Sequence, residues 1–147
     1  ISDEETLLEK FRHMMTIPQT TAILMQPMLS GTQIFIGAKR EGNFGHLILC
    51  GLGGIFVETL KDINYSLSPV SRVEADEMIR TLRSYRILEG TRGQEGVNIP
   101  MFSEAVRRVS ALCQAAPEIF EMDINPLMAG TRQITAVDAR IRIEKER

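Results

Sequence analysis

The stretch from Pro117 to Arg142 constrains the fold most, because its pattern predicts a β-hairpin. The first strand carries Ile119, Phe120, Met122 and Ile124, residues 129–131 form the turn, and residues 134–143 form the return strand. Side chains two residues apart in a strand point to the same face. We therefore expect Asp123 and Asn125 to share one face, while Met122 and Ile124 face the core.

The return strand is expected to place Asp138 opposite Asp123 and Asn125, which would gather oxygen ligands at one end of a short sheet. Carboxylate and amide oxygens without nearby His or Cys suit a hard cation such as Mg²⁺, which completes its shell with phosphates and water. This arrangement indicates nucleotide chemistry. A second interpretation stays open, in which residues 125–126 are only a strand end and Asp138 is a surface carboxylate.

Composition excludes several other classes of protein. The 147 residues make one domain-sized unit, or one lobe of something larger. The net charge of −2 does not indicate nucleic-acid binding. No apolar run or signal-peptide pattern indicates a membrane-spanning or secreted protein. Cys50 and Cys113 lack metal-ligand spacing, which favours two core thiols and a cytoplasmic location. Because the chain begins at Ile1 without Met, we expect a fragment of a longer protein.

Periodicity along the chain predicts a compact α+β lobe with a mainly antiparallel sheet and packed helices. The expected helices span residues 3–15, 71–84 and 101–115. The expected strands before the hairpin span residues 21–28, 32–39, 46–50, 55–60 and 62–70. The first three of these strands are expected to form an antiparallel meander.

Two glycine-containing stretches are further candidates for a binding site. Gly53 and Gly54 belong to a run of three glycines in four residues after a strand, so their N–H groups could face a phosphate. The run also fits a tight turn where two backbones pack closely. In the loop from Leu88 to Gly93, Arg92 could clamp a phosphate or merely be solvated. All of these alternatives remain open at this stage.

Three ordered stretches carry a resemblance to a known family: MQPMLSGTQIFIGAKREGNFG, then LILCGLGGIFVETLKD, then EMDINPL followed by AVDARI. Their order and spacing are similar to the carboxy-terminal half of the ATP-grasp domain in ADP-forming acyl-CoA synthetases. These enzymes, acetate–CoA ligase (ADP-forming) among them, are relatives of the succinyl-CoA synthetase β subunit. The resemblance covers nearly the whole chain, including the loop from Leu88 to Gly93.

The resemblance implies an ATP-grasp fold in which two α+β lobes hold ATP between them. It also implies the interconversion of acyl-CoA, ADP and phosphate with an organic acid, ATP and CoA, through an acyl phosphate and a phosphohistidine. The metal ligands would be Asn125 and Asp138, which hold Mg²⁺, and the catalytic candidates Asp123 and Arg92. The implied nucleotide contacts are Met25, Gln26, Met28, Gln33, Gly53 and Gly54, with Met25 and Gln26 along the adenine.

The sequence departs from the family pattern in three ways. Gln33 stands where the family usually has a ribose-binding Glu. His46 stands where Pro is usual, which could indicate a phosphoryl carrier but fits an incidental substitution better. The third departure is the expected absence, from this fragment, of the amino-terminal lobe and of the CoA-binding and phosphohistidine domains. The implied partners are the missing amino-terminal lobe, the CoA-binding and phosphohistidine domains, CoA and a small organic acid, in an oligomer without nucleic acid or membrane. The fragment alone is therefore expected to be inactive.

Two other functions remain open. One is a nucleotide- or acyl-CoA-sensing module fused to a protein acetyltransferase, for which the Gln33 departure leaves room. The other is a structural lobe that only docks against other subunits.

Overall fold

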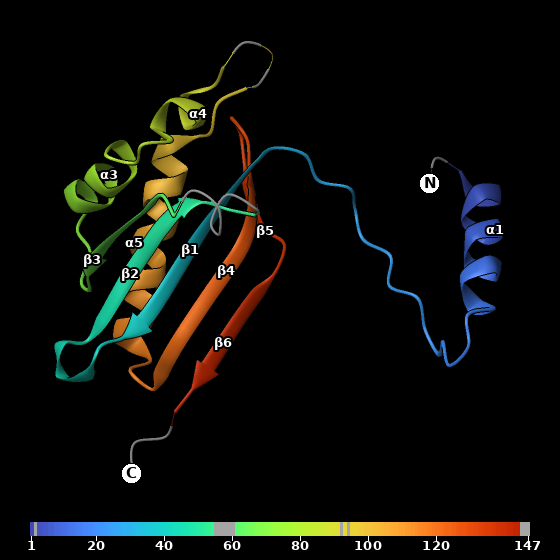
Figure 1. Ribbon diagram of the computed structural model, residues 1–147, viewed down its shortest axis with the longest axis horizontal. Helices are drawn as coiled ribbons and strands as arrows, with labels where there is room; N and C mark the ends of the chain where they lie inside the picture. Colours follow the sequence, from blue (N-terminus) through green and yellow to red (C-terminus); the bar gives the residue numbers. More distant parts are fainter. Residues whose placement is uncertain (2, 55–60, 92, 94, 145–147) are drawn as a thin grey trace.

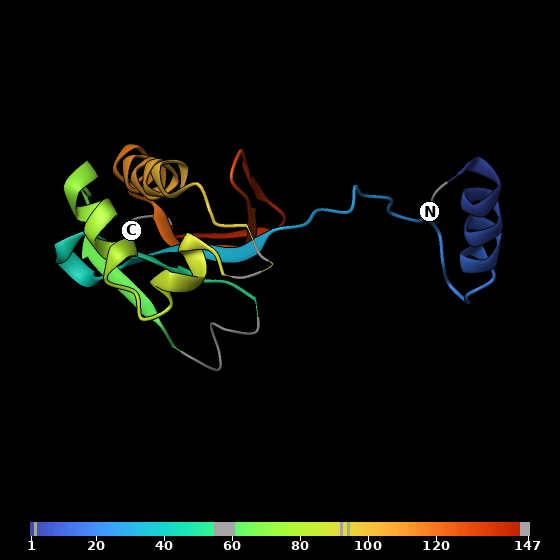
Figure 2. The same cartoon turned by 90° about the horizontal axis from the view of Figure 1, so that it is seen from above.

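The fold has two layers, an antiparallel sheet and a layer of helices on one of its faces. The computed structural model describes residues 1, 3–54, 61–91, 93 and 95–144. Within these ranges a six-stranded sheet is covered on one face by α3 (Arg72–Arg80) and α5 (Ile99–Ala115), as Figures 1 and 2 show. The α+β class with packed helices is confirmed.

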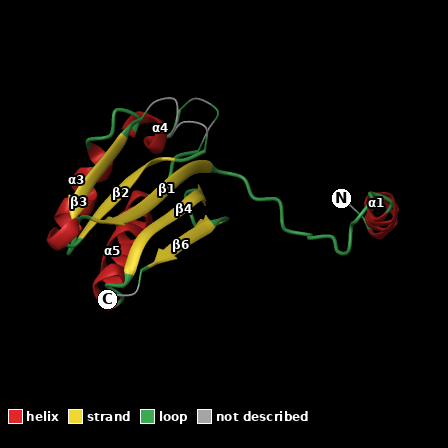
Figure 3. Cartoon of the chain, turned by 60° about the horizontal axis from the view of Figure 1, so that its bottom comes forward, coloured by secondary structure: helices red, strands yellow, loops and turns green. Residues whose placement is uncertain are grey.

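All strand pairs of the sheet are antiparallel. The strands are β1 (Thr32–Arg40), β2 (His46–Leu52), β3 (Ile63–Leu67), β4 (Ile119–Ala129), β5 (Ile134–Ala136) and β6 (Ala139–Ile143). The order is β3-β2-β1-β4-β5. Strand β6 also pairs with β4 and lies beside it in Figure 3. The long strand β4 therefore has β1 on one side and both return strands on the other.

The helices begin at capping residues that are visible in the sequence. Asp3 caps α1 (Glu4–Met15) by accepting a hydrogen bond from the Thr6 N–H at 2.8 Å. Ser71 and Glu74 form a complete capping box at the start of α3. The short α4 (Tyr85–Glu89) and the 3₁₀ turn η1 (Gly42–Phe44) complete the regular structure of the described residues.

The predicted strand at residues 21–28 is wrong. Residues 20–30 form neither helix nor strand, and Leu24 and Met28 are 81% and 97% exposed. No described strand pairs with this segment, because it leaves the sheet to connect α1 with β1 (Figure 1). The observed meander is instead β1-β2-β3.

Other boundaries differ in smaller ways. The helix predicted over residues 71–84 ends at Arg80, and α4 starts separately at Tyr85. The strand predicted over residues 62–70 is shorter, since β3 covers Ile63–Leu67. The hairpin is confirmed, but its return strand is divided into β5 and β6 at residues 137–138. The strand predicted at residues 55–60 lies outside the described residues.

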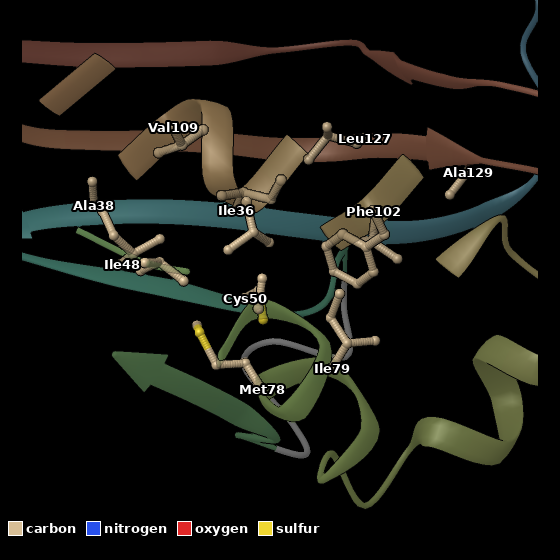
Figure 4. Close-up of a cluster of buried hydrophobic side chains, with 14 of the residues drawn as sticks. Ile36, Ala38, Ile48, Cys50, Met78, Ile79, Phe102, Val109, Leu127 and Ala129 are labelled. Carbon is tan, nitrogen blue, oxygen red and sulfur yellow. The ribbon is translucent and has the colours of Figure 1, made fainter. Parts of the chain in front are cut away.

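The core lies between the sheet and the helices. Alternate side chains of β1 and β2, including Ile36, Ile48 and Cys50, are fully buried against α3 and α5. Figure 4 shows them meeting Ile79 and Phe102 from the two helices. Alternation then directs the remaining side chains of these strands to the opposite face, which neither α3 nor α5 covers.

Helix α1 stands apart from the sheet (Figures 1 and 2). None of its residues is buried, and its apolar side chains Leu8, Phe11 and Met14 are 43–48% exposed. Neither α1 nor any other helix in the described part of the chain has the length and apolar character needed to cross a membrane.

Candidate functional site

The divided return strand brings Asn125 and Asp138 side by side. The Asn125 N–H donates a hydrogen bond to the Asp138 carbonyl oxygen at 3.2 Å, and Asp123 lies opposite Arg140 in the register of β4 and β6. The backbones of Asp123, Asn125 and Asp138 therefore lie close together, and the gathering of their side-chain oxygens remains a prediction. Their functional roles remain predictions.

The glycine run at the end of β2 also lies beside Asn125. The Gly54 N–H donates to Oδ1 of Asn125 at 3.1 Å, across 71 positions of sequence. A side chain at Gly54, whose φ is +63°, would collide with Oε1 of Gln33. Gln33, Gly54 and Asn125 thus form one junction at the end of the sheet, which we call the Asn125 junction.

Gly53 and Gly54 use their N–H groups within the protein. The Gly53 N–H donates to the Gln33 carbonyl oxygen at 2.8 Å, and a Cβ on Gly53 would lie 2.6 Å from the Ile34 carbonyl oxygen. These contacts favour the close-packing interpretation of the glycine run over the one in which both N–H groups stay free for a phosphate. A nucleotide contact from either glycine remains a prediction.

Negative charge gathers beside the Asn125 junction. Partial removal of water raises the pKa of the Asp123 carboxyl; Arg140 acts against this increase, and Asp138 and Glu121 add to it. The Asp138 carboxylate is half exposed and lies 3.6 Å from Nε of Arg140. Two neighbouring carboxylates with a single guanidinium favour the approach of a further cation.

Arg140 was missed as a site residue in the sequence. It lies two positions after Asp138, and this spacing in a strand would have indicated that both side chains share a face. The Asn125 contact with Gly54 carried no such signal, because its two residues are brought together only by the pairing of β1 with β2 and β4.

The residues expected along the adenine do not gather at the Asn125 junction. Met25 is 67% exposed and lines an apolar groove with α1, while Gln26 is an exposed residue of the same segment. Met28 lines a separate cavity with Met128, the strand neighbour of Gln33. Arg92 lies outside the described residues. The nucleotide roles of these residues and the catalytic role of Arg92 remain predictions.

His46 has a structural position. Its side chain is 5% exposed, and its Nε2 lies 2.6 Å from the Ile119 carbonyl oxygen. The imidazole therefore links the start of β2 to the start of β4. This position agrees with an incidental substitution rather than with a phosphoryl carrier.

Comparison with known proteins gives a consistent result. A family model described as an ATP-grasp domain matches residues 1–143. The beta subunit of acetate–CoA ligase (ADP-forming) I from Pyrococcus furiosus is 37% identical over 137 residues, which cover 92% of this chain and 59% of the subunit. Acetate–CoA ligase (ADP-forming) I from Archaeoglobus fulgidus is 38% identical over 125 residues, which cover 84% of this chain and 18% of that ligase.

A solved structure is similar over the same region. The dinucleotide-forming acetyl-coenzyme A synthetase 1 from Ca. Korarchaeum cryptofilum, in complex with coenzyme A and Mg-AMPPCP, matches with a TM-score of 0.81 and 33% identity. The match covers 97% of this chain and 65% of that chain. This chain therefore spans only part of the length of each of these relatives.

Proposed function

This chain belongs to the ATP-grasp family, and from that premise we propose that it forms the Mg-nucleotide-binding lobe of an ADP-forming acyl-CoA synthetase. The reaction would interconvert acyl-CoA, ADP and phosphate with an organic acid, ATP and CoA through a phosphohistidine. The single observation that carries the proposal is the contact of Asn125 with both Gly54 and Asp138. This contact joins the glycine run to the oxygen-rich end of β4.

The donor atoms of this region fit Mg²⁺. Among the described residues, no group of three or more His, Cys, Asp and Glu side chains comes together to hold a metal ion. Mg²⁺ needs no such group, because it takes one or two protein oxygens and fills the remaining positions with phosphates and water. Asn125 and Asp138 supply an amide oxygen and a carboxylate of this kind.

In this proposal each residue has a defined task. Asn125 and Asp138 hold the cation, which when bound neutralises charge on the phosphates. Arg140 restrains the Asp138 carboxylate through its ion pair, and Gly54 fixes the Asn125 amide through its N–H. Asp123 lies two residues before Asn125 on β4 and would keep water and cations ordered near the transferring phosphoryl group.

The nucleotide would lie across the face of the sheet opposite α3 and α5. Gln33 binds the ribose through a neutral amide, Met25 and Gln26 run along the adenine, and Met28 lies near it. This arrangement needs a second lobe opposite the sheet, because one open face gives little enclosure. We assign that role to the rest of the ATP-grasp domain, and the exposed apolar side of α1 is where it would dock.

The test uses the complete natural protein that contains this chain. Asn125→Ala and Asp138→Ala are each expected to lower the rate of CoA- and acid-dependent ATP turnover by about a hundredfold, because the phosphates lose their charge-neutralising cation. Glu118→Gln is the matched control: it removes an exposed carboxylate just before the start of β4, away from the junction, and should change the rate by less than about twofold. Normal turnover in both alanine variants, with folding verified by circular dichroism, would contradict the metal assignment.

Other parts of the proposal concern the whole protein. Its partners are CoA, a small organic acid, and the CoA-binding and phosphohistidine domains. The whole protein forms an oligomer. A cytoplasmic location is supported by two free, buried thiols at Cys50 and Cys113. The sensor fused to an acetyltransferase stays an untested alternative. Its discriminating observation is the sequence on either side of this chain.

A further inference from the structure

A second cavity lies on the helix side of the sheet, away from the Asn125 junction. It has a volume of about 390 Å³ and is lined by α3, by α4 and by the first half of α5, with Arg72, Asp76, Arg80, Tyr85, Ser103 and Arg107 on its walls. Met122 of β4 is buried on this helix side, so Asp123 points to the opposite face. This second cavity, called here the helix-side cavity, is therefore separate from the proposed nucleotide site.

The walls of the helix-side cavity carry positive charge without a matching partner. Arg72 and Arg80 lie eight positions apart on one side of α3, with Asp76 midway between them. The side chain of neither arginine makes an ion pair or a hydrogen bond with any residue that the structure describes. Arg72 also stands in the first turn of α3, where a cation opposes the helix dipole. The stability of α3 therefore does not explain why an arginine stands at position 72.

One of the two acidic residues that line the helix-side cavity is already paired with arginines. Glu104 accepts hydrogen bonds from Arg107 at 2.8 Å and from Arg108 at 3.0 Å. Arg108 does not line the cavity, and it neutralises the negative charge of Glu104 from the solvent side. Among the described residues that line the cavity, Asp76 is the other acid, against the two unpaired guanidinium groups of Arg72 and Arg80. The net positive charge of the cavity walls favours the binding of an anion.

Ser103 provides independent evidence that points to a ligand. Its side chain is 3% exposed, and its hydroxyl oxygen has no hydrogen-bond partner in the described part of the chain. Buried polar groups are nearly always hydrogen-bonded, and this one lies on the cavity wall beside the first turn of α5. That end of a 17-residue helix carries partial positive charge, which also favours an anionic oxygen.

We infer that the helix-side cavity binds a small phosphorylated organic molecule. Guanidinium groups pair with phosphate oxygens through two parallel hydrogen bonds, and the Ser103 hydroxyl donates a further one. The volume lies in the range of small-molecule sites rather than that of a bare ion. The Tyr85 ring and the apolar side chains of Ile99 and Pro100 contact the organic part. This site is independent of the nucleotide chemistry proposed above.

The experiment titrates phenyl phosphate into the full 147-residue chain and follows backbone amides by ¹⁵N nuclear magnetic resonance. Saturable shifts are expected at residues 72–85 and 99–107, with a dissociation constant of about 1 mM or lower. Arg72→Gln and Arg80→Gln should each weaken binding about fivefold or more, and Ser103→Ala about threefold. The matched control is Arg86→Gln, because Arg86 is an exposed arginine of α4 that does not line the cavity, and this variant should bind as the wild type does.

Four results would overturn the inference. The first is the absence of saturable shifts at these residues, and the second is an equal loss of affinity in Arg86→Gln, which would mean diffuse surface charge. The third is equal affinity for inorganic phosphate, which would exclude a role for the organic part. The fourth is equal affinity for phenol, which would exclude recognition of the phosphate. Asn125→Ala should leave this binding unchanged, so the test does not depend on the proposed function.

Discussion

Gly53 is the residue at which a single added carbon has the clearest consequence. A Cβ at this position would lie 2.6 Å from the Ile34 carbonyl oxygen, and this oxygen belongs to the backbone of a central strand. The strand cannot move without disturbing its pairing with β2 and β4. The absence of a side chain at Gly53 therefore sets how closely the glycine run approaches β1.

Gly53→Ala is expected to lower the free energy of unfolding by about 1–3 kcal/mol, because overpacking at a fixed backbone costs that much. Urea denaturation measures the change. Gly37→Ala is the matched control on β1, since a Cβ there would meet its nearest atom, the Met122 carbonyl oxygen, at 3.4 Å. Equal losses in the two variants would contradict the account of Gly53.

At the scale of elements, Asp62 connects β3 to the turn before α4. Its carboxylate accepts hydrogen bonds from the Arg83 N–H at 3.0 Å and from the Ser84 N–H at 2.7 Å. Burial acts to raise the pKa of Asp62, but the hydrogen bonds from Ser84 and Arg83 outweigh it and hold the pKa below its usual value. The charged form is therefore the one that stabilises this connection.

Asp62→Asn is expected to lower the free energy of unfolding by about 1 kcal/mol at pH 7, because an amide accepts these hydrogen bonds more weakly than a carboxylate. The folded-state pKa of Asp62 is lowered, so its contribution is present above the unfolded pKa and is lost as the pH falls through the folded pKa. Unfolding curves of wild type and variant should thus converge in acid, below the usual pKa of 3.8. A difference that persists there would contradict the electrostatic part of the account.

The sequence predicted the elements whose signals are local. The helices predicted from residues 3 and 71 begin at Glu4 and Arg72, and alternation around Met122 predicted β4 and its return. The strand at residues 21–28 was wrong because a β pattern says nothing about whether a partner strand is present. The site followed the same rule: Asp138 was placed beside Asn125 by alternation within one hairpin, whereas the Gly54 contact required knowledge of the whole sheet.

At the scale of the whole molecule, α1 and the segment after it leave apolar surface uncovered. Leu24 and Met25 are 81% and 67% exposed, and with Phe11 they line a groove of about 420 Å³. Such a surface promotes association when its natural cover is absent. In the proposed assembly the remainder of the ATP-grasp domain provides that cover.

Sedimentation velocity of the 147-residue chain is expected to show concentration-dependent self-association, and Phe11→Asp should reduce it by placing a charge in the groove. Phe44→Asp is the control, since Phe44 is 80% exposed on η1 and lies outside this groove. An equal effect of the two substitutions would mean that association does not depend on α1.

The most direct test of the central claim is calorimetric titration of ADP into the complete natural protein, with Mg²⁺ and with chelator. Mg²⁺ should raise ADP affinity by about tenfold, or about 1.4 kcal/mol, in the wild type. In Asp138→Ala and Asn125→Ala this gain should disappear while metal-free binding of ADP is unchanged. A gain of the same size in both variants would show that the cation is held elsewhere.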